Sequence, residues 1–274
     1  MHNNAPSGHT VLHVPYEPTV EEIKQGMDQG AFSLTYQPYF GHEMDELLGI
    51  EAFIRWRHQG LGVILPAVRF VAAAQQDSEL ALAMDGMVLH AAAGQAMEFG
   101  RIWGKKLPLA VNCMTWNREE MFLAMLEQVR KKYAAGFSSL ELDCTEAIFS
   151  ADSAAVSRNM VALARKGIAM GMDNCSLTSD LIPKIKGLPL RSLKINLTHF
   201  TRSDKVTETK KWVKQLRHSH SLNLVAIGVE DSEDLEYLRE IGFNAFQGAI
   251  FKCPLSAEDV IRFLQFMQQA HDAY

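Results

Sequence analysis

Hydrophobic and polar positions along the chain follow two alternating periods. Short apolar runs typical of buried strands are separated by longer amphipathic segments typical of helices. The predicted strands are residues 33–37, 47–55, 107–112, 140–143, 168–173, 190–195, 222–227 and 243–251. The predicted helices are residues 20–30, 66–75, 80–99, 117–133, 151–166, a short one that ends near 187, 206–218, 232–241 and 257–270.

Strands that alternate with helices at a spacing of roughly thirty residues indicate parallel βαβ units. About eight such units closed into a barrel occupy roughly 250 residues, which fits the 274 residues of the chain. The competing architecture, an open doubly wound sheet, requires a Gly-rich turn after its first strand, whereas the chain there reads QPYFG at 37–41. We therefore predict an α/β fold, a modified (β/α)8 TIM-type barrel over residues 19–274, preceded by a flexible tail over residues 1–18.

Composition narrows the class of protein further. The chain is 47% hydrophobic with a net charge of -5, which suits a domain with a large core and argues against a broad nucleic-acid surface. Its most apolar stretch, residues 80–97, contains Asp85, His90 and Gln95, so it indicates a buried helix rather than a membrane span. Residues 1–10 lack the apolar core of a signal peptide, and four cysteines are few for a disulfide framework. These features predict a cytoplasmic protein with no membrane span and no direct contact with nucleic acid.

Polar side chains that can bind a cation recur where short apolar runs end. These side chains are Glu51, Asn112, Asp143, Asp173 and Lys194. In a (β/α)8 barrel the strand ends meet at one face, which holds the active site. The carboxylates and the amide offer oxygen ligands only, which suit Mg²⁺ or Mn²⁺ rather than zinc, and such sites commonly act on phosphates. The run at 222–227 breaks the pattern, because it ends in Ile227, which neither binds a metal nor moves a proton.

Several sequence motifs match those of one known family in the same order. They are YQP at 36–38, GIEAFIRWRH at 49–58, the helix start at 66–71, AVN at 110–112, LELDCTE at 140–146, SLKIN at 192–196, GVE at 228–230 and FQG at 246–248. Over about residues 20–270 the chain resembles the EAL domain, the fold of bacterial cyclic-di-GMP phosphodiesterases. The resemblance implies a barrel that binds cyclic-di-GMP across its C-terminal mouth. In active members, two metals there activate the water that cleaves one phosphodiester and gives linear pGpG.

The resemblance also implies roles for single residues. The positions that would hold a first Mg²⁺ or Mn²⁺ are Glu51, Asn112, Asp143 and Asp173. The positions that would contact the ligand are Gln37, Arg55, Pro66, Glu230 and Gln247. Lys194 would contact the catalytic water, and Glu146 would brace the loop that follows Asp173.

The chain departs from the family's pattern at the centre of its chemistry. Asn174 replaces a carboxylate of the second metal site, and Ile227 replaces the glutamate that acts as general base. Asn196 replaces an aspartate, and Asp143 replaces a glutamate that is one methylene longer. Loss of the general base alone costs about 10²–10⁴ in rate, and loss of the second metal removes the charge that generates hydroxide at neutral pH.

These departures predict a degenerate EAL domain that acts as a regulator in bacterial signalling. It would bind cyclic-di-GMP or another protein, such as a transcription regulator, with one Mg²⁺ or Mn²⁺ at most and with Lys194 as a vestige of the chemistry. The alternative is an active or weak metal-dependent cyclic-di-GMP phosphodiesterase, which Asn174 and Ile227 disfavour. A homodimer is compatible with either function.

Three cysteines, Cys113, Cys144 and Cys175, each follow a strand or its last polar residue. A ring of thiols at the barrel mouth is one interpretation. Neighbouring side chains of a strand point to opposite faces, so Cys113 and Cys144 should face the helices if Asn112 and Asp143 point inward. We therefore expect the thiols to lie in the core.

Overall fold

The computed structural model describes residues 16–43, 46–176, 178, 180–196, 206–219 and 222–272. The strands found there are β1 Phe32–Phe40, β2 Leu47–His58, β3 Val63–Pro66, β4 Leu109–Asn112, β5 Leu140–Thr145, β6 Ala169–Cys175, β7 Ser192–Asn196, β8 Asn223–Ile227 and β9 Ala245–Gln247. The helices are α1 Val20–Asp28, η1 Ala67–Arg69, α2 Val71–Ala74, α3 Ser78–Trp103, α4 Glu119–Lys132, α5 Ala134–Phe137, α6 Glu146–Ala151, α7 Ser153–Arg165, α8 Leu181–Ile185, α9 Val206–Ser219, α10 Ser232–Ile241 and α11 Ala257–Asp272.

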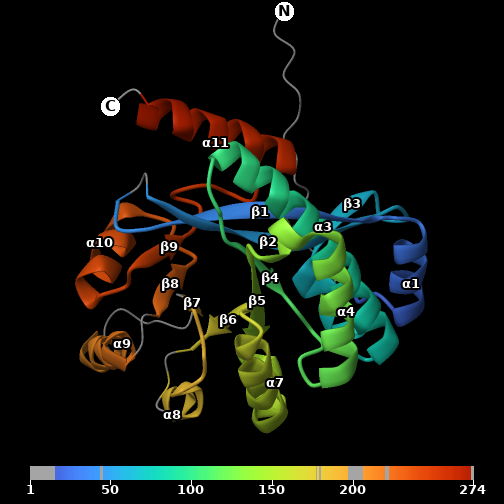
Figure 1. Cartoon of the computed structure of the whole chain (residues 1–274), viewed down its shortest axis with the longest axis horizontal. Helices are drawn as coiled ribbons and strands as arrows, with labels where there is room; N and C mark the ends of the chain where they lie inside the picture. The colour runs from blue at the N-terminus through green and yellow to red at the C-terminus, as the bar shows by residue number, and fades with distance from the viewer. Residues whose placement is uncertain are drawn as a thin grey trace, which may run out of the picture.

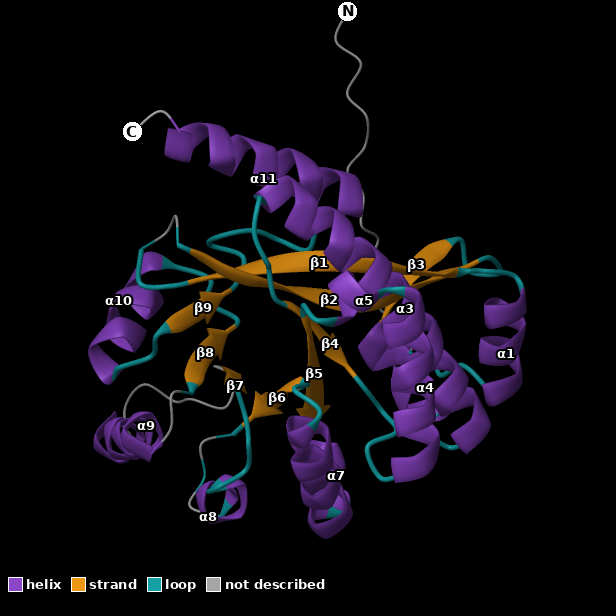
Figure 2. Ribbon diagram, in the orientation of Figure 1, coloured by secondary structure: helices purple, strands orange, loops and turns teal. Residues whose placement is uncertain are grey.

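The strands form one sheet in the order β1-β9-β8-β7-β6-β5-β4-β2-β3, and an additional pairing of β1 with β2 closes it. The result is a barrel of eight strands with helices around the outside, from which β3 projects as a ninth strand (Figure 1). Figure 2 shows the strands around the axis and α11 lying across β1. The predicted modified (β/α)8 barrel is therefore confirmed.

One strand runs against the others, which modifies the barrel. β1 is antiparallel to both of its neighbours, β2 and β9, whereas β4 to β9 pair in parallel. The long ladder with β2 places Gln37 opposite Glu51, and a single pair, Phe40 with Phe246, joins β1 to β9. The barrel is closed by contact between the first and the last strand of the described chain.

Several elements differ from those predicted, three of them by more than their ends. β3 was not predicted. The predicted helix 151–166 corresponds to α7, and the short helix α6 before it was not predicted; Asp152 separates the two, because its backbone is non-helical and its side chain caps α7 by accepting from the Ala155 N–H at 3.0 Å. The predicted last strand, 243–251, is only residues 245–247. Gly248 lies directly against the backbone of Val229, and the chain turns there.

The first helix begins as the sequence indicates. Thr19 caps it, and Glu22 completes a capping box by accepting from the Thr19 N–H at 2.8 Å. Tyr16 lies just before the cap, where its hydroxyl donates to Glu22 at 3.0 Å and lies 2.7 Å from His58 Nε2. Most of the predicted tail, residues 1–15, lies outside the described residues. No described helix has the length and apolar character that a membrane crossing requires.

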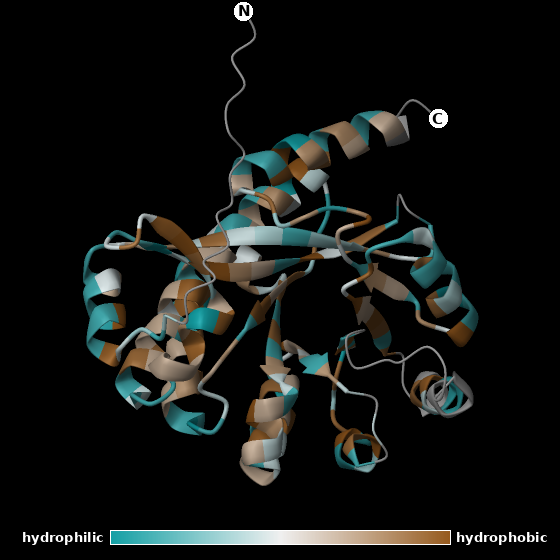
Figure 3. Cartoon of the chain, turned by 180° about the vertical axis from the view of Figure 1, so that it is seen from behind, coloured by the Kyte–Doolittle hydropathy of each residue, from teal (hydrophilic) through white to brown (hydrophobic). Residues whose placement is uncertain are grey.

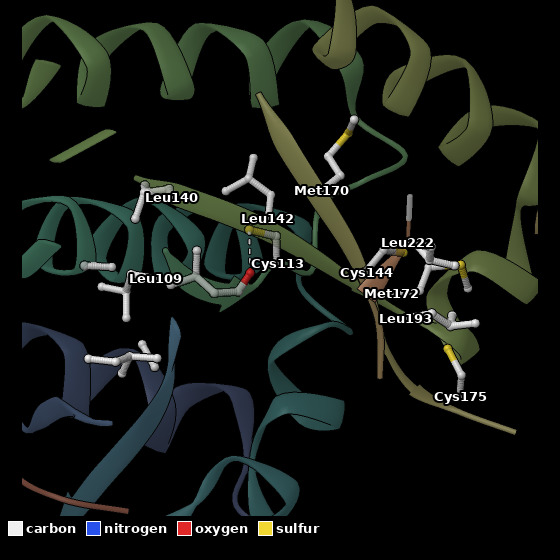
Figure 4. Packing of buried hydrophobic residues seen from close by; sticks show 14 of the residues in the cluster. Leu109, Cys113, Leu140, Leu142, Cys144, Met170, Met172, Cys175, Leu193 and Leu222 are labelled. Carbon is white, nitrogen blue, oxygen red and sulfur yellow. Dashed lines mark hydrogen bonds between the residues drawn. The ribbon is translucent and has the colours of Figure 1, made fainter. Parts of the chain in front are cut away.

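The outer face of the barrel packs against amphipathic helices. In Figure 3, α8 and α9 carry apolar and polar residues together, as helices with one covered face do. Between strands and helices lie the thiols of Cys113, Cys144 and Cys175, each at most 2% exposed. Figure 4 shows these thiols among Leu and Met side chains such as Leu142 and Met172. The prediction that the thiols belong to the core is confirmed, and burial raises the pKa of each one.

Candidate functional site

The polar side chains at the strand ends meet inside the mouth of the barrel. The parallel register places Asn112 beside Asp143 on neighbouring strands. Lys194, on β7, donates from Nζ to Asp143 Oδ2 at 2.5 Å and to Glu51 Oε2 at 2.7 Å. Asn112 Nδ2 donates to Glu51 Oε1 at 3.0 Å, and Gln247 Nε2 donates to Glu51 Oε2 at 3.2 Å. Five strands, β2, β4, β5, β7 and β9, thus contribute to a single hydrogen-bonded cluster.

Burial makes the charges of this cluster interdependent. Glu51, Asp143 and Lys194 are each at most 1% exposed. Burial opposes the charge of Lys194, but Asp143 and Glu51 outweigh it and hold the pKa of the ammonium well above its usual range. Burial raises the pKa of Asp143 and of Glu51, against the pull of the Lys194 charge. The ammonium is therefore the positive charge that allows two carboxylates to lie side by side out of water.

The donor chemistry of the cluster fits one divalent cation. Asn112 Oδ1 and Asp143 Oδ1 are buried without a hydrogen-bond partner among the described residues, and oxygen atoms of this kind are the ligands that Mg²⁺ prefers. The net charge is about −2 when the carboxylates of Glu51, Asp143 and Asp173 are added to the ammonium of Lys194. This charge would be balanced by the +2 charge of one divalent cation. No group of three or more His, Cys, Asp or Glu in the described chain is arranged to hold a metal, so the amide of Asn112 would be needed as a ligand.

Beyond Asp173, the described tips of β6, β7 and β8 carry no carboxylate. Asn174 has a left-handed backbone with φ 54°, and its Oδ1 accepts from Asn196 Nδ2 at 2.7 Å. Asn196 on β7 lies beside Ile227 in the parallel pairing of β7 with β8. The strand ends beyond Asp173 are therefore occupied by two neutral amides, which are hydrogen-bonded to each other, and by one aliphatic side chain.

Glu146 lies next to the segment that follows β6. Its carboxylate accepts from the Ser176 backbone N–H at 2.7 Å and from the Ser176 hydroxyl at 2.9 Å. Glu146 is the first residue of α6, whose cap Thr145 accepts from the Ile148 N–H. The segment after Asp173 is thus attached to the start of a helix on the neighbouring unit.

A cleft of about 390 Å³ opens beside the cluster. Four of the residues singled out from the sequence line it, namely Asn112, Asp173, Asn174 and Ile227. Most of its remaining wall is apolar and includes Phe53, Ile54, Val68, Met84, Met114 and Ile148. A cleft of this volume with few polar groups is typical of sites for small organic ligands.

The residues expected to contact a ligand do not line this cleft. Gln37 donates from its amide to the Lys252 carbonyl at 2.8 Å. Arg55 donates to the carbonyl of Ile54 at 3.0 Å, and its guanidinium lies 5.5 Å from the ring centre of Phe53.

The other three expected contacts also lie elsewhere. Pro66 ends β3 and precedes η1, Glu230 is exposed after β8, and Gln247 is 4% exposed inside the barrel. Of the five, Gln247 alone belongs to the buried cluster, through its hydrogen bond to Glu51.

Asp85 on α3 is a buried residue that the sequence analysis did not assign to the site. Its carboxylate accepts from the backbone N–H groups of Met114 and Thr115 at 2.9 Å and from the Thr115 hydroxyl at 2.7 Å. Trp116 then donates from Nε1 to the Asp143 carbonyl at 3.1 Å. Asp85 thus fixes the loop that follows Asn112 and forms one wall of the cleft. The signal available in the sequence was a single acidic residue in the most apolar stretch of the chain.

Replacement of Asp85 by Asn is expected to lower the free energy of unfolding by about 3 kcal/mol. An amide places an N–H₂ group where the carboxylate faces two backbone N–H groups and a hydroxyl. Urea unfolding measures the loss, and Asp152→Asn, at the exposed cap of α7, is the matched control. A loss below about 1 kcal/mol would contradict the role given to this carboxylate.

The pH dependence of that loss has a defined sign. Burial raises the pKa of Asp85 to about 6, against the hydrogen bonds, which lower it. A carboxyl whose pKa is higher when folded stabilises most below its unfolded pKa, and this stabilisation is lost as the pH rises through about 6. Wild-type stability should therefore fall more steeply than that of Asp85→Asn between pH 4 and about 7.

The EAL domain family model matches residues 20–254 of the chain. Among curated proteins, "Cyclic di-GMP phosphodiesterase PA2567" of Pseudomonas aeruginosa is 28% identical over 243 residues, which cover 86% of this chain and 40% of that protein. "Oxygen sensor protein DosP" of Escherichia coli is 25% identical over 243 residues, which cover 87% of this chain and 30% of that protein. The chain therefore spans less than half the length of these relatives.

Solved structures share the fold. The phosphodiesterase PaMucR in a c-di-GMP complex aligns with a TM-score of 0.76 at 24% identity, covering 88% of this chain and 98% of that one. The FimX EAL domain of Pseudomonas aeruginosa bound to c-di-GMP aligns with a TM-score of 0.70 at 18% identity, covering 86% and 96%. At these identities the alignments establish a common architecture.

Proposed function

Because the chain belongs to the EAL domain family, we propose that it is a member that binds a signal at the barrel mouth without hydrolysing it. The family includes cyclic-di-GMP phosphodiesterases, which are generally dependent on divalent metals. In this proposal the chain keeps part of that binding site, acts as a regulator in the cytoplasm and transmits ligand binding rather than turnover.

The observation that carries the proposal is the chemistry at the tips of β6, β7 and β8. Asn196 Nδ2 donates to Asn174 Oδ1 at 2.7 Å, and Ile227 lines the cleft with an aliphatic side chain. A general base must lie within hydrogen-bond reach of the water that it activates, and Ile227 has no atom that accepts a proton. The residues left for a second cation reduce to Asp173.

One cation is compatible with this assignment. Glu51, Asn112, Asp143 and Asp173 would hold it, and when bound it would polarise a phosphate oxygen. Lys194, fixed between Glu51 and Asp143, keeps the buried carboxylates paired when no cation is present. The site would then orient a phosphate group but lack the means to activate water.

Cyclic-di-GMP is the ligand we favour. The cleft has a volume of about 390 Å³ and mainly apolar walls, and its polar lining comprises Gln75, Asp85, Asn112, Thr145, Asp173 and Asn174. Arg55 lies half-buried on β2, directly after Phe53 and Ile54, which line the cleft, and would offer a positive charge for a phosphate. The alternative ligand is a protein, such as a transcription regulator, that covers the same apolar cleft.

An active or weak phosphodiesterase remains the second candidate function. The observation in its favour is that Glu51, Asn112, Asp143 and Lys194 still converge in one cluster. An active phosphodiesterase and a binding protein would both have a first cation site of this composition.

Calorimetry and a hydrolysis assay separate these functions. We expect cyclic-di-GMP to bind with micromolar affinity, to bind more tightly with Mg²⁺, and to yield no pGpG with Mg²⁺ or Mn²⁺. Turnover within about tenfold of an intact family member would contradict the proposal, since the missing base alone accounts for more than that factor. Absence of heat at high ligand concentration would exclude cyclic-di-GMP and leave a protein as the ligand.

Arg55→Ala tests the ligand contact, and Arg57→Ala is the matched control. Arg57 is exposed on the same strand, two residues further along. Weaker binding in the first variant alone would place the phosphate beside Arg55.

A further inference from the structure

The hairpin of β2 and β3 carries an uncharged, apolar surface. Residues 59–68 read QGLGVILPAV and contain no charged side chain. Of the seven large hydrophobic side chains exposed in the described chain, three lie in this segment: Leu61 at 37%, Ile64 at 52% and Val68 at 82%. Exposed apolar side chains that gather in this way mark interaction surfaces.

No described strand pairs with the outer edge of β3. In the described sheet β3 comes last in order and pairs only with β2. Within that ladder Ile64 lies opposite Arg57, and the Arg57 N–H donates to the Ala31 carbonyl at 2.8 Å, toward β1. In an antiparallel ladder a residue directs its N–H and C=O to the same side, and such pairs alternate along the strands. The backbone N–H and C=O of Ile64 therefore point away from β2, toward the open edge.

The two faces of β3 differ. Leu65, paired with Trp56, is 4% exposed and packs in a cluster with Phe70 and Met84. Ile64 belongs to the opposite, solvent-facing side. Edge strands of native proteins are usually protected by charged side chains or by proline. Here Pro66 limits the length of the edge, and β3 itself carries no charged side chain; the charged residue on the face of Ile64 is Arg57, opposite it on β2.

We propose that two copies of this chain associate by pairing β3 with β3 in antiparallel orientation around a two-fold axis at Ile64. In this arrangement the Ile64 N–H of each copy donates to the Ile64 C=O of the other. The two Ile64 side chains then lie next to each other on the same face and cover each other from water.

A second copy is the occupant that this surface fits best. A two-fold contact satisfies the donor and the acceptor of Ile64 at once and in the same way on both copies, and two-fold dimers are the commonest oligomers. The whole chain has a net charge of -5, which opposes association elsewhere, whereas residues 59–68 bring no like charges together.

The dimer is expected to be weak, and it has a consequence for the cleft. A ladder of four residues buries less than the roughly 1,200 Å² at which specific interfaces become stable. β3 leads directly into η1, whose Ala67 and Val68 line the cleft. Pairing of β3 would therefore restrain one wall of the ligand site in both copies.

Sedimentation velocity over a concentration series tests the association. The wild type should shift toward the dimer between roughly 5 and 500 µM, and Ile64→Lys should weaken association at least about tenfold. Met121→Lys, at an exposed apolar residue of α4, is the control and should dimerise as the wild type does. A wild type that stays monomeric throughout, or an Ile64→Lys variant that dimerises normally, would overturn the proposal.

Disulfide trapping tests the register. In a background with Cys253→Ser, which removes the exposed thiol among the four cysteines, Ile64→Cys should form an intermolecular disulfide under mild oxidation. Directly paired strand residues have Cα atoms about 5.5 Å apart, within the range of a disulfide. Met121→Cys in the same background sets the rate of random collision. Equal rates for the two variants would refute pairing at Ile64, whatever the oligomeric state.

Discussion

A variant that combines Asn174→Asp with Ile227→Glu is expected to hydrolyse cyclic-di-GMP in Mn²⁺ at least about a hundredfold faster than the wild type. The two substitutions place carboxylates at the tips of β6 and β8, on either side of Asn196 and next to Asp173. They supply ligands for a second cation and a proton acceptor in reach of a bound water. Production of pGpG, followed by chromatography, is the measurement.

The single variants are the controls for this experiment. Asn174→Asp restores a ligand without a base, and Ile227→Glu restores a base beside an amide, so each alone should give far less activity than the pair. If the pair is inactive, Asp143→Glu should be added, because the shorter side chain of Asp143 is engaged by Lys194 at 2.5 Å. Inactivity of this triple variant would show that the loss of function extends beyond the cation ligands and the base.

Lys194→Met is expected to lower the free energy of unfolding at neutral pH by about 3–5 kcal/mol. The ammonium is 1% exposed and lies between Glu51 and Asp143. Removal of one partner leaves two buried carboxylates without their counter-charge, which costs far more than removal of an exposed pair. Urea unfolding gives the difference, and Lys252→Met, at an exposed lysine, is the control.

The pH dependence of the Lys194 effect follows from its pKa. The pKa of Lys194 is raised in the folded protein, so its stabilising contribution is complete below the unfolded value and is lost only when the pH rises through the folded one. In the variant the unpaired carboxylates take up protons, so the loss of stability should shrink as the pH falls from 8 to about 5. A loss below about 1 kcal/mol at pH 8 would contradict the buried ion pair. Restoration of stability by Mg²⁺ would place a cation in the same cluster.

Periodicity predicted the architecture because each strand of the barrel is buried on both faces and each helix on one. Periodicity failed to predict the elements whose position depends on a few particular residues. β3 lies within a segment in which the apolar residues Val63 to Leu65 are followed by Pro66, and its pairing with β2 depends on a turn that no period reveals. The break between α6 and α7 depends on Asp152, whose cap becomes visible only once the backbone is placed.

The candidate site was predictable to a similar depth. Strand-end residues such as Glu51 and Asp143 were expected to converge, since parallel strands end at one face. The sequence did not reveal that Lys194 lies between these two carboxylates, because the hydrogen-bond partners of a buried lysine depend on side-chain geometry. The apolar wall of the cleft escaped prediction for another reason: Val68 and Met84 belong to η1 and α3, whose positions relative to the barrel follow from packing.

The pairing of Phe40 with Phe246 determines when the protein can finish folding during its synthesis. These residues are 206 positions apart, from 246 minus 40, so at about 5–20 residues per second the ribosome needs roughly 10–40 s to extend the chain from one to the other. The hairpin of β1 and β2 forms locally and early, while the edge of β1 that awaits β9 stays unpaired for that time. Nascent chains thus expose an open strand edge until β9 emerges, and chaperones that cover such edges would act in this interval.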